Sequence, residues 1–196
     1  MSTKNVAAML GAILLLGAPA LAIGQEYFGA AALPLASKRL PASAEECAVW
    51  GRERSFAASV VSHDKDAWIS HLHPGVIFDV TSGADAMRGL DAVTKAWPGL
   101  SGTKNFVVRW RPGVVMIGGD PNTAVSVGPY VFQGRKGGVE KVSVGFFQTI
   151  WVRDSKDGVW RVLFDGDAST EIPVADRAAA DAWVAEQDMS DCLGQK

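Results

Sequence analysis

The sequence predicts an α+β domain: a curved antiparallel sheet wrapped around N-terminal helices, with an extra helix near the C-terminus. Three observations predict this class. Helical patterns follow residue 43, whereas long runs of Val, Phe, Ile and Trp dominate after residue 106. Residues 139–168 form two such runs around a polar connection ending in Asp157-Gly158, a hairpin signal. Both faces of that hairpin are apolar, so we expect helices on one face and a further layer or a partner chain on part of the other.

The chain is long enough for one domain with extensions, and its charge excludes one class of partner. It has 196 residues and a net charge of −2. This balance provides no basic surface, so no nucleic acid partner is expected.

The first 22 residues have the composition of a secretory signal peptide. Lys4 precedes an apolar run over residues 6–16, and small residues that suit a cleavage site follow at 17–22. The run is short for a membrane span, although an uncleaved anchor remains the alternative. Residues 23–42 are interpreted as a linker or loose arm. We therefore expect an exported protein, periplasmic or secreted, with no stable membrane association after cleavage.

The two cysteines are expected to form a disulfide. Cys47 and Cys192 are the only pair in the chain. In an exported protein an even pair indicates a structural bridge before it indicates catalysis. This bridge would hold the C-terminal extension, residues 170–196, against the domain over residues 43–169.

A capping box opens the first helix. Ser43 is followed three residues later by Glu46, and the helix is expected to run to about Ser62. Val49, Phe56 and Val60 recur at helical spacing and predict a buried stripe. The charged residues expected on its solvent side are Arg52, Glu53 and Arg54.

Shorter elements follow. Asp64 can cap a helix over 65–72, which His73-Pro74-Gly75 would end. Residues 76–80 are a predicted strand, 81–89 a loop, and 90–97 a third helix stopped by Pro98-Gly99. The predicted strands beyond it cover 106–117, with a bulge at Pro112-Gly113, and 123–134. A final helix is predicted from Pro173 to about Gln187.

Several stretches together resemble a known family. They are His73-Pro-Gly-Val-Ile-Phe-Asp, Met87-Arg-Gly-Leu-Asp-Ala-Val, Gly128-Pro-Tyr, Gly145-Phe-Phe-Gln-Thr-Ile-Trp-Val-Arg and Gly158-Val-Trp-Arg-Val-Leu-Phe-Asp-Gly. Over about Ala44–Ser169 the chain resembles the SnoaL-like branch of the nuclear transport factor 2-like superfamily, which includes ketosteroid isomerase and polyketide cyclases. The resemblance implies a cone-shaped fold with a pocket between sheet and helices, and often a homodimer through the sheet. Such a fold hosts enzymes, binding proteins and assembly modules alike.

Two residues are candidates for catalysis. Asp79 lies within an apolar run, and desolvation would raise the pKa of its carboxyl towards that of a useful base. The alternatives are that Asp79 points outwards or caps the loop through Thr81. His71 is either an acid–base group of the pocket or a structural histidine. Its spacing from His73 does not suit one helical face, so no metal site is expected.

Aromatic side chains are the candidate walls of the pocket, although packing in the core is the alternative for each of them. Asp165 and Asp167 are interpreted as holding the rim or a loop. The predicted ligand-binding residues are Trp50, Trp68, Phe78, Trp97, Tyr130 and Gln148.

The chain departs from ketosteroid isomerase where that enzyme places its oxyanion donors. The first helix has Trp50 and Phe56 but no tyrosine, and Glu140 lies only at the edge of the hairpin's first strand. The sequence therefore favours a pocket that binds a small apolar molecule, without catalysis and with no cofactor. The alternative is an isomerase, cyclase or hydratase that uses Asp79 or His71 as base. A homodimer is expected through the sheet face bearing Phe147, Trp151 and Trp160, or through the opposite face.

Overall fold

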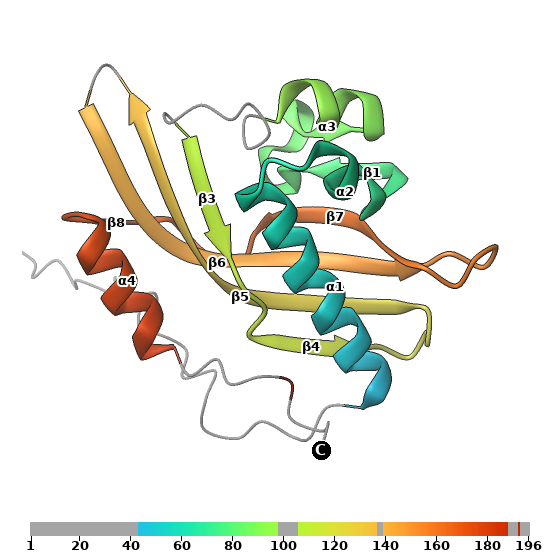
Figure 1. The fold of residues 1–196 in the computed structure, drawn as a ribbon. Helices are drawn as coiled ribbons and strands as arrows, with labels where there is room; N and C mark the ends of the chain where they lie inside the picture. Colours follow the sequence, from blue (N-terminus) through green and yellow to red (C-terminus); the bar gives the residue numbers. More distant parts are fainter. Residues whose placement is uncertain (1–42, 98–105, 137–138, 188–191, 193–196) are drawn as a thin grey trace, which may run out of the picture. The chain divides into compact units, whose positions relative to one another are not determined.

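The computed structural model describes residues 43–97, 106–136, 139–187 and 192 (Figure 1). The chain divides into two units, Met1–Leu33 and Pro34–Lys196, and every described residue belongs to the second. The predicted signal peptide and linker, residues 1–42, lie outside the described residues, as does the Pro98-Gly99 stop.

Four α-helices and one 3-10 helix are present in the described part of the chain, and two of the expected caps are confirmed. Ser43 accepts a hydrogen bond from the Glu46 amide at 3.2 Å, and Glu46 accepts one from the Ser43 amide at 2.7 Å. Asp64 caps the second helix through the Ala67 amide at 3.0 Å. The helices are α1 (Ala44–Val61), α2 (Lys65–Ser70), η1 (Val80–Asp85), α3 (Leu90–Ala96) and α4 (Arg177–Glu186).

The strands form one curved, unclosed sheet in the order β2-β1-β7-β6-β5-β3, with β4 paired to β5 and β8 paired to β6. Their bounds are β1 (Leu72–Phe78), β2 (Met87–Arg88), β3 (Phe106–Trp110), β4 (Val114–Ile117), β5 (Thr123–Lys136), β6 (Val139–Arg153), β7 (Trp160–Asp167) and β8 (Ile172–Val174).

The sheet is mixed, whereas the sequence predicts a purely antiparallel one. The meander from β3 to β7 is antiparallel as expected, but β1 lies parallel to β7 at its side. Leu72 belongs to β1 and not to α2, where the sequence predicts it, because the chain pairs with β7 from this point on. The Val162 amide of β7 donates a hydrogen bond to the His71 carbonyl at 2.8 Å.

The bulge expected at Pro112-Gly113 is confirmed. β3 and β4 both pair with β5, with Trp110 opposite Tyr130 and Val114 opposite Val127, so this side carries one residue more than β5. Gly128 faces the bulge, where an added Cβ would lie 2.0 Å from the Arg111 carbonyl oxygen. Only glycine fits this close approach.

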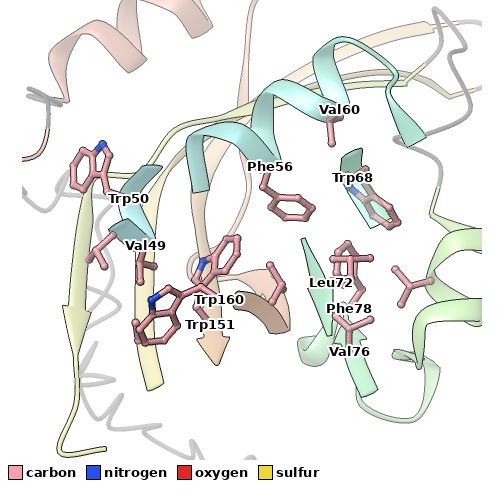
Figure 2. Packing of buried hydrophobic residues seen from close by; sticks show 14 residues of the cluster. Val49, Trp50, Phe56, Val60, Trp68, Leu72, Val76, Phe78, Trp151 and Trp160 are labelled. Carbon is pink, nitrogen blue, oxygen red and sulfur yellow. The ribbon is translucent and has the colours of Figure 1, made fainter. Parts of the chain in front are cut away.

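The main core lies between α1 and the inner face of the sheet, where Val49, Phe56 and Val60 are buried as predicted (Figure 2). The inner face of β6 contributes Trp151, which meets Phe56 edge-on with ring centroids 6.1 Å apart. The hairpin's apolar residues thus pack against α1 on this side, as expected from its composition.

The outer face of the sheet is covered in part by α4. Val131, Val142 and Val144 point to this face and form a second cluster with Ala180 of α4. Phe146 and Trp183 add an aromatic contact at 5.3 Å. The further layer expected on the second face is therefore supplied over this region by the chain itself.

The C-terminal helix begins later than predicted. Pro173 lies in β8 and does not open the helix; Asp176 caps α4 through the Ala179 amide at 2.9 Å. Proline is tolerated in β8 because that strand is short and paired on one side only, with β6. The predicted disulfide between Cys47 and Cys192 is present. None of the helices in the described ranges is long and apolar enough to cross a membrane.

Candidate functional site: an aromatic pocket with acidic residues

The inner face of the sheet carries a pocket of about 270 Å³. Its walls come from α1, the end of β1, the residue after α3, and strands β3, β5, β6 and β7. The lining residues are Phe56, Phe78, Asp79, Trp97, Phe106, Val108, Trp110, Tyr130, Phe132, Phe147, Asp165, Gly166, Asp167 and Glu171.

Three of the six predicted ligand-binding residues, Phe78, Trp97 and Tyr130, line this pocket. Trp68 lies one layer behind: it is fully buried and stacks on Trp97 with ring centroids 5.2 Å apart. Trp50 is buried in the same core (Figure 2). Gln148 is exposed on the opposite face of the sheet, because its neighbour Phe147 points inwards and side chains alternate along a strand.

Asp79 reaches the pocket through an unusual backbone conformation. It follows β1 with φ 55° and ψ 47°, in the left-handed region, and makes no capping hydrogen bond to η1. Residues other than glycine are uncommon in this region, and aspartate is among those that enter it most often. Its carboxyl lines the pocket with its surface accessible to solvent, and partial burial raises its pKa.

His71 is not brought to the pocket. Its Nδ1 lies 2.7 Å from the Ala67 carbonyl oxygen, so Nδ1 carries the proton and donates it. Nε2 then accepts from the Ser55 hydroxyl at 2.6 Å. Burial, followed by the neighbouring Arg52, lowers the pKa of His71 to about 4. These contacts fix the imidazole as a neutral link between α1 and α2.

Asp165 is the most enclosed acid of the pocket. It comes from β7, is partly buried, and accepts a hydrogen bond from the Thr149 hydroxyl at 3.3 Å. Burial raises its pKa to about 8, and the charges of Glu53 and Asp79 add to the effect. At neutral pH Asp165 therefore carries a proton most of the time.

Tyr130 and Asp167 form a second polar pair at the pocket. Their side chains are joined by a hydrogen bond, and burial is the main cause that raises the pKa of both groups. Gly145 makes room for Tyr130: an added Cβ would lie 2.8 Å from the tyrosine ring. The tyrosine is 7% exposed, so its ring is held firmly by the wall.

Glu53 is a buried carboxyl that sequence analysis placed wrongly on the solvent side of α1. It is completely buried, and it accepts hydrogen bonds from the indole nitrogens of Trp110 and Trp151, each at 2.7 Å. Burial raises its pKa, and these hydrogen bonds oppose the rise. The signal was present in the sequence, since 49, 53, 56 and 60 follow one helical stripe.

The pocket thus combines aromatic walls with carboxyl groups. Asp79, Asp165, Asp167 and Glu171 line it, and none of the lining residues that the structure describes is Lys, Arg or His. Within the described ranges, no group of His, Cys, Asp or Glu side chains is arranged to hold a metal ion.

Comparison with known proteins identifies the fold. No protein-family model matches the chain, and no curated protein does either. Solved structures do match, with the chain spanning nearly the whole length of each. A ketosteroid isomerase-like protein from Erwinia carotovora atroseptica has a TM-score of 0.50 and 15% identity, over 65% of this chain and 100% of that one.

A Xanthomonas campestris protein described as a calcium/calmodulin dependent protein kinase II association domain also has a TM-score of 0.50. It shares 14% identity, over 71% of this chain and 95% of that one. A nuclear transport factor 2-like superfamily protein from Salmonella enterica has a TM-score of 0.49 and 15% identity, over 67% and 92%. The chain shares the fold of the two structures with a TM-score of 0.50, which is the nuclear transport factor 2-like fold that the sequence predicts.

Proposed function

We propose that the protein binds a small, mostly apolar molecule in this pocket. The observation that carries the proposal is the pocket itself: aromatic side chains form most of its walls, and a few carboxyl groups are placed among them. Binding sites for small molecules have this composition, because apolar area provides affinity and a few polar groups set orientation.

The bound molecule should be detectable directly. Native mass spectrometry of the purified chain is expected to find a molecule that is lost when Val108, in the pocket wall, is changed to Phe. Val107→Phe is the matched control. Val107 lies beside Val108 on β3 but points to the outer face of the sheet, and it pairs there with Gln133 of β5. Equal retention of the molecule by both variants would contradict binding at this site.

A second candidate is a proton-transferring enzyme of the isomerase, cyclase or hydratase kind. Asp79 and Asp165 favour it, because burial raises the pKa of both carboxyl groups and brings that of Asp165 to about 8. Such a pair can supply a base and an acid at the same pH. In this reading Asp79, accessible at the pocket, takes the proton and Asp165, still protonated, donates one.

Base activity can be tested without knowing the substrate. 5-Nitrobenzisoxazole loses its C3 proton to any well-placed base, the N–O bond breaks, and a coloured phenolate forms. We expect the protein to accelerate this elimination, and Asp79→Asn to reduce the rate about tenfold or more. Glu186→Gln, an exposed carboxyl on α4, should leave the rate unchanged. An equal rate in Asp79→Asn would remove Asp79 as the base.

The protein is also proposed to be exported, with residues 1–22 removed as a signal peptide, a SnoaL-like domain over 43–169 and a C-terminal extension over 170–196. The disulfide between Cys47 and Cys192 supports an oxidising compartment. Intact mass of the protein recovered from its native compartment tests the cleavage, since a species that retains Met1 would speak against it.

A homodimer is proposed through the outer face of the sheet. The face bearing Phe147, Trp151 and Trp160 is excluded as the contact, because these residues are buried within the chain. On the outer face, α4 covers only the region near Val131 and Val144, whereas Met116 is 55% exposed. Light scattering at micromolar concentration checks the proposal, and a monomer would overturn it.

A further inference from the structure

We propose that the occupant of the pocket is an organic cation: an amine or quaternary ammonium group on an apolar, partly aromatic body. This inference rests on the proposed binding function and names its ligand class. The carboxyl groups would hold the charged nitrogen, and the aromatic rings would surround the rest.

The charge of the lining is one-sided. Four carboxyl groups take part, and no cationic side chain opposes them among the described lining residues. Asp79 and Asp167 each raise the pKa of Asp165, so the groups are close enough to repel one another when ionised. A cation placed among them removes this repulsion, whereas a neutral or anionic group does not.

The aromatic rings are arranged as walls set at steep angles. Phe78 meets Trp97 at 83°, Trp97 meets Phe106 at 75°, and Phe106 meets Phe132 at 70°, with centroids 5.1–6.3 Å apart. A space bounded by such rings suits a cation, because the negative face of an aromatic ring attracts positive charge.

Glu53 strengthens this attraction at one wall. Trp110 lines the pocket and donates its indole N–H to the buried Glu53 carboxyl at 2.7 Å. Donation of a hydrogen bond to a carboxyl shifts electron density towards the ring and makes its face more negative. Trp110 is thus the ring best prepared to contact an ammonium group.

A separate hollow of about 630 Å³ shares Phe106, Phe132 and Glu171 with the pocket. Arg135 and Lys141 line that hollow and are exposed, so solvent and salt screen their charges. Arg135 and Lys141 do not line the pocket itself, and their positive charges would disfavour binding of an ammonium group in that hollow.

Three probes of one shape test the inference: 4-phenylbutylammonium, 4-phenylbutan-1-ol and 4-phenylbutanoate. Calorimetric titration of the full chain at about pH 8 is suitable, since an alkylammonium is still charged there and Asp165 is partly ionised. We expect the cation to bind at least about tenfold more tightly than the alcohol, and the anion most weakly.

Variants locate the charge selectivity. Asp165→Asn and Asp79→Asn are each expected to weaken cation binding about three- to tenfold while the affinity for the alcohol changes less than about twofold. Glu186→Gln removes the same charge from an exposed position on α4 and should change neither. Circular dichroism shows whether each variant is folded. If Asp165→Asn does not fold, Asp79→Asn, which changes an accessible residue, still tests the inference.

The outcomes separate the inference from the function on which it rests. If the alcohol binds as tightly as the ammonium, or the carboxyl variants leave the ratio unchanged, the cation inference is wrong and the apolar pocket stands. If none of the probes binds and no molecule co-purifies, the proposed binding function fails and the inference fails with it.

Discussion

Replacement of Glu53 by Gln tests the central contact between α1 and the sheet. The wild-type carboxyl has two acceptor oxygens, and each receives one indole N–H, from Trp110 and from Trp151. Glutamine keeps the size but offers only one acceptor oxygen, since its other terminal atom is itself a donor. One indole N–H must then face an NH₂ group with no water to replace the lost bond, because position 53 is completely buried.

The expected loss of unfolding free energy is about 2–4 kcal/mol. About 1–3 kcal/mol comes from the stranded donor, and the rest from the lost hydrogen bond itself. The loss of unfolding free energy also depends on pH, because the wild-type carboxyl titrates. The folded-state pKa of Glu53 is raised, so the wild-type contribution is fully present below the unfolded-state pKa and is lost as the pH rises through the folded-state value. Glutamine does not titrate, so its destabilising effect should be largest below the unfolded-state pKa of 4.5 and should shrink at higher pH.

Urea denaturation followed by far-ultraviolet circular dichroism measures the effect without relying on tryptophan emission. Glu45→Gln is the control on the same helix: Glu45 is exposed, and its ion pair with Arg153 at 3.1 Å contributes less than about 1 kcal/mol. A double-mutant cycle adds a sharper test. In a Trp151→Phe background the stranded donor is absent, so Glu53→Gln should be about 1–2 kcal/mol milder.

Two results would refute this reasoning. One is a Glu53→Gln variant whose unfolding free energy lies within about 0.5 kcal/mol of the wild-type value below the unfolded-state pKa of 4.5, which would mean that the paired indoles find other partners. The other is a cycle without coupling, which would place the loss elsewhere than in the indole contacts.

The remaining predictions concern pH, the disulfide and one glycine. His71 has a folded-state pKa lowered to about 4 from 6.5, so its contribution to the unfolding free energy is full above pH 6.5 and falls by about 3 kcal/mol towards pH 4. His71→Gln should flatten this fall when urea denaturation is measured across pH. Asp165 has a folded-state pKa raised to about 8 from 3.8, so its contribution to the unfolding free energy is full below pH 3.8 and is lost as the pH rises towards 8. Asp165→Asn should therefore raise the unfolding free energy most at alkaline pH, by roughly 2–4 kcal/mol. Reduction of the Cys47–Cys192 bond, which spans a separation of 145 residues, should lower the unfolding free energy by up to about 5 kcal/mol; equal urea midpoints with and without reductant would contradict this. Gly145→Ala should cost about 1–3 kcal/mol by displacing the Tyr130 ring, whereas Gly118→Ala, where an added Cβ meets nothing within 4 Å, should be nearly neutral in thermal melts.

Local signals account for the part of the fold that could be predicted from the sequence. The capping box at Ser43 and the hairpin around Asp157-Gly158 each depend on residues close in the chain, and both are present. The parallel pairing of β1 with β7 is not local, since it joins segments about 90 residues apart, and no pattern within β1 indicates its partner. Pro173 suits both a first helical turn and a short edge strand, so its identity alone could not decide.

The residues of the candidate site could be predicted only where strand alternation or helical spacing distinguishes a pocket position from a core position. Phe78, Trp97 and Tyr130 line the pocket, but Trp50 and Trp68 have the same apolar character and lie in the core. Gln148 shares a strand face with Val142 and Val144, and the sequence does not say which face of β6 is the inner one. For Glu53, the charge was given more weight than the helical stripe that contains it.

The titration behaviour of the acids separates the pocket from the rest of the described chain. Of the acids with resolved shifts, Glu46, Asp120 and Asp157 have lowered pKa values, and they accept hydrogen bonds at a helix cap or in turns, where the charged form is stabilised. The acids with raised values are Glu53, Asp79, Asp165 and Asp167. Three of these line the pocket and Glu53 lies directly behind its Trp110 wall. A raised pKa means that folding disfavours the charged carboxyl, so each such group lowers stability at neutral pH unless something bound there compensates. Raised pKa values gathered around one cavity, together with the left-handed backbone of Asp79, therefore support the proposed binding function.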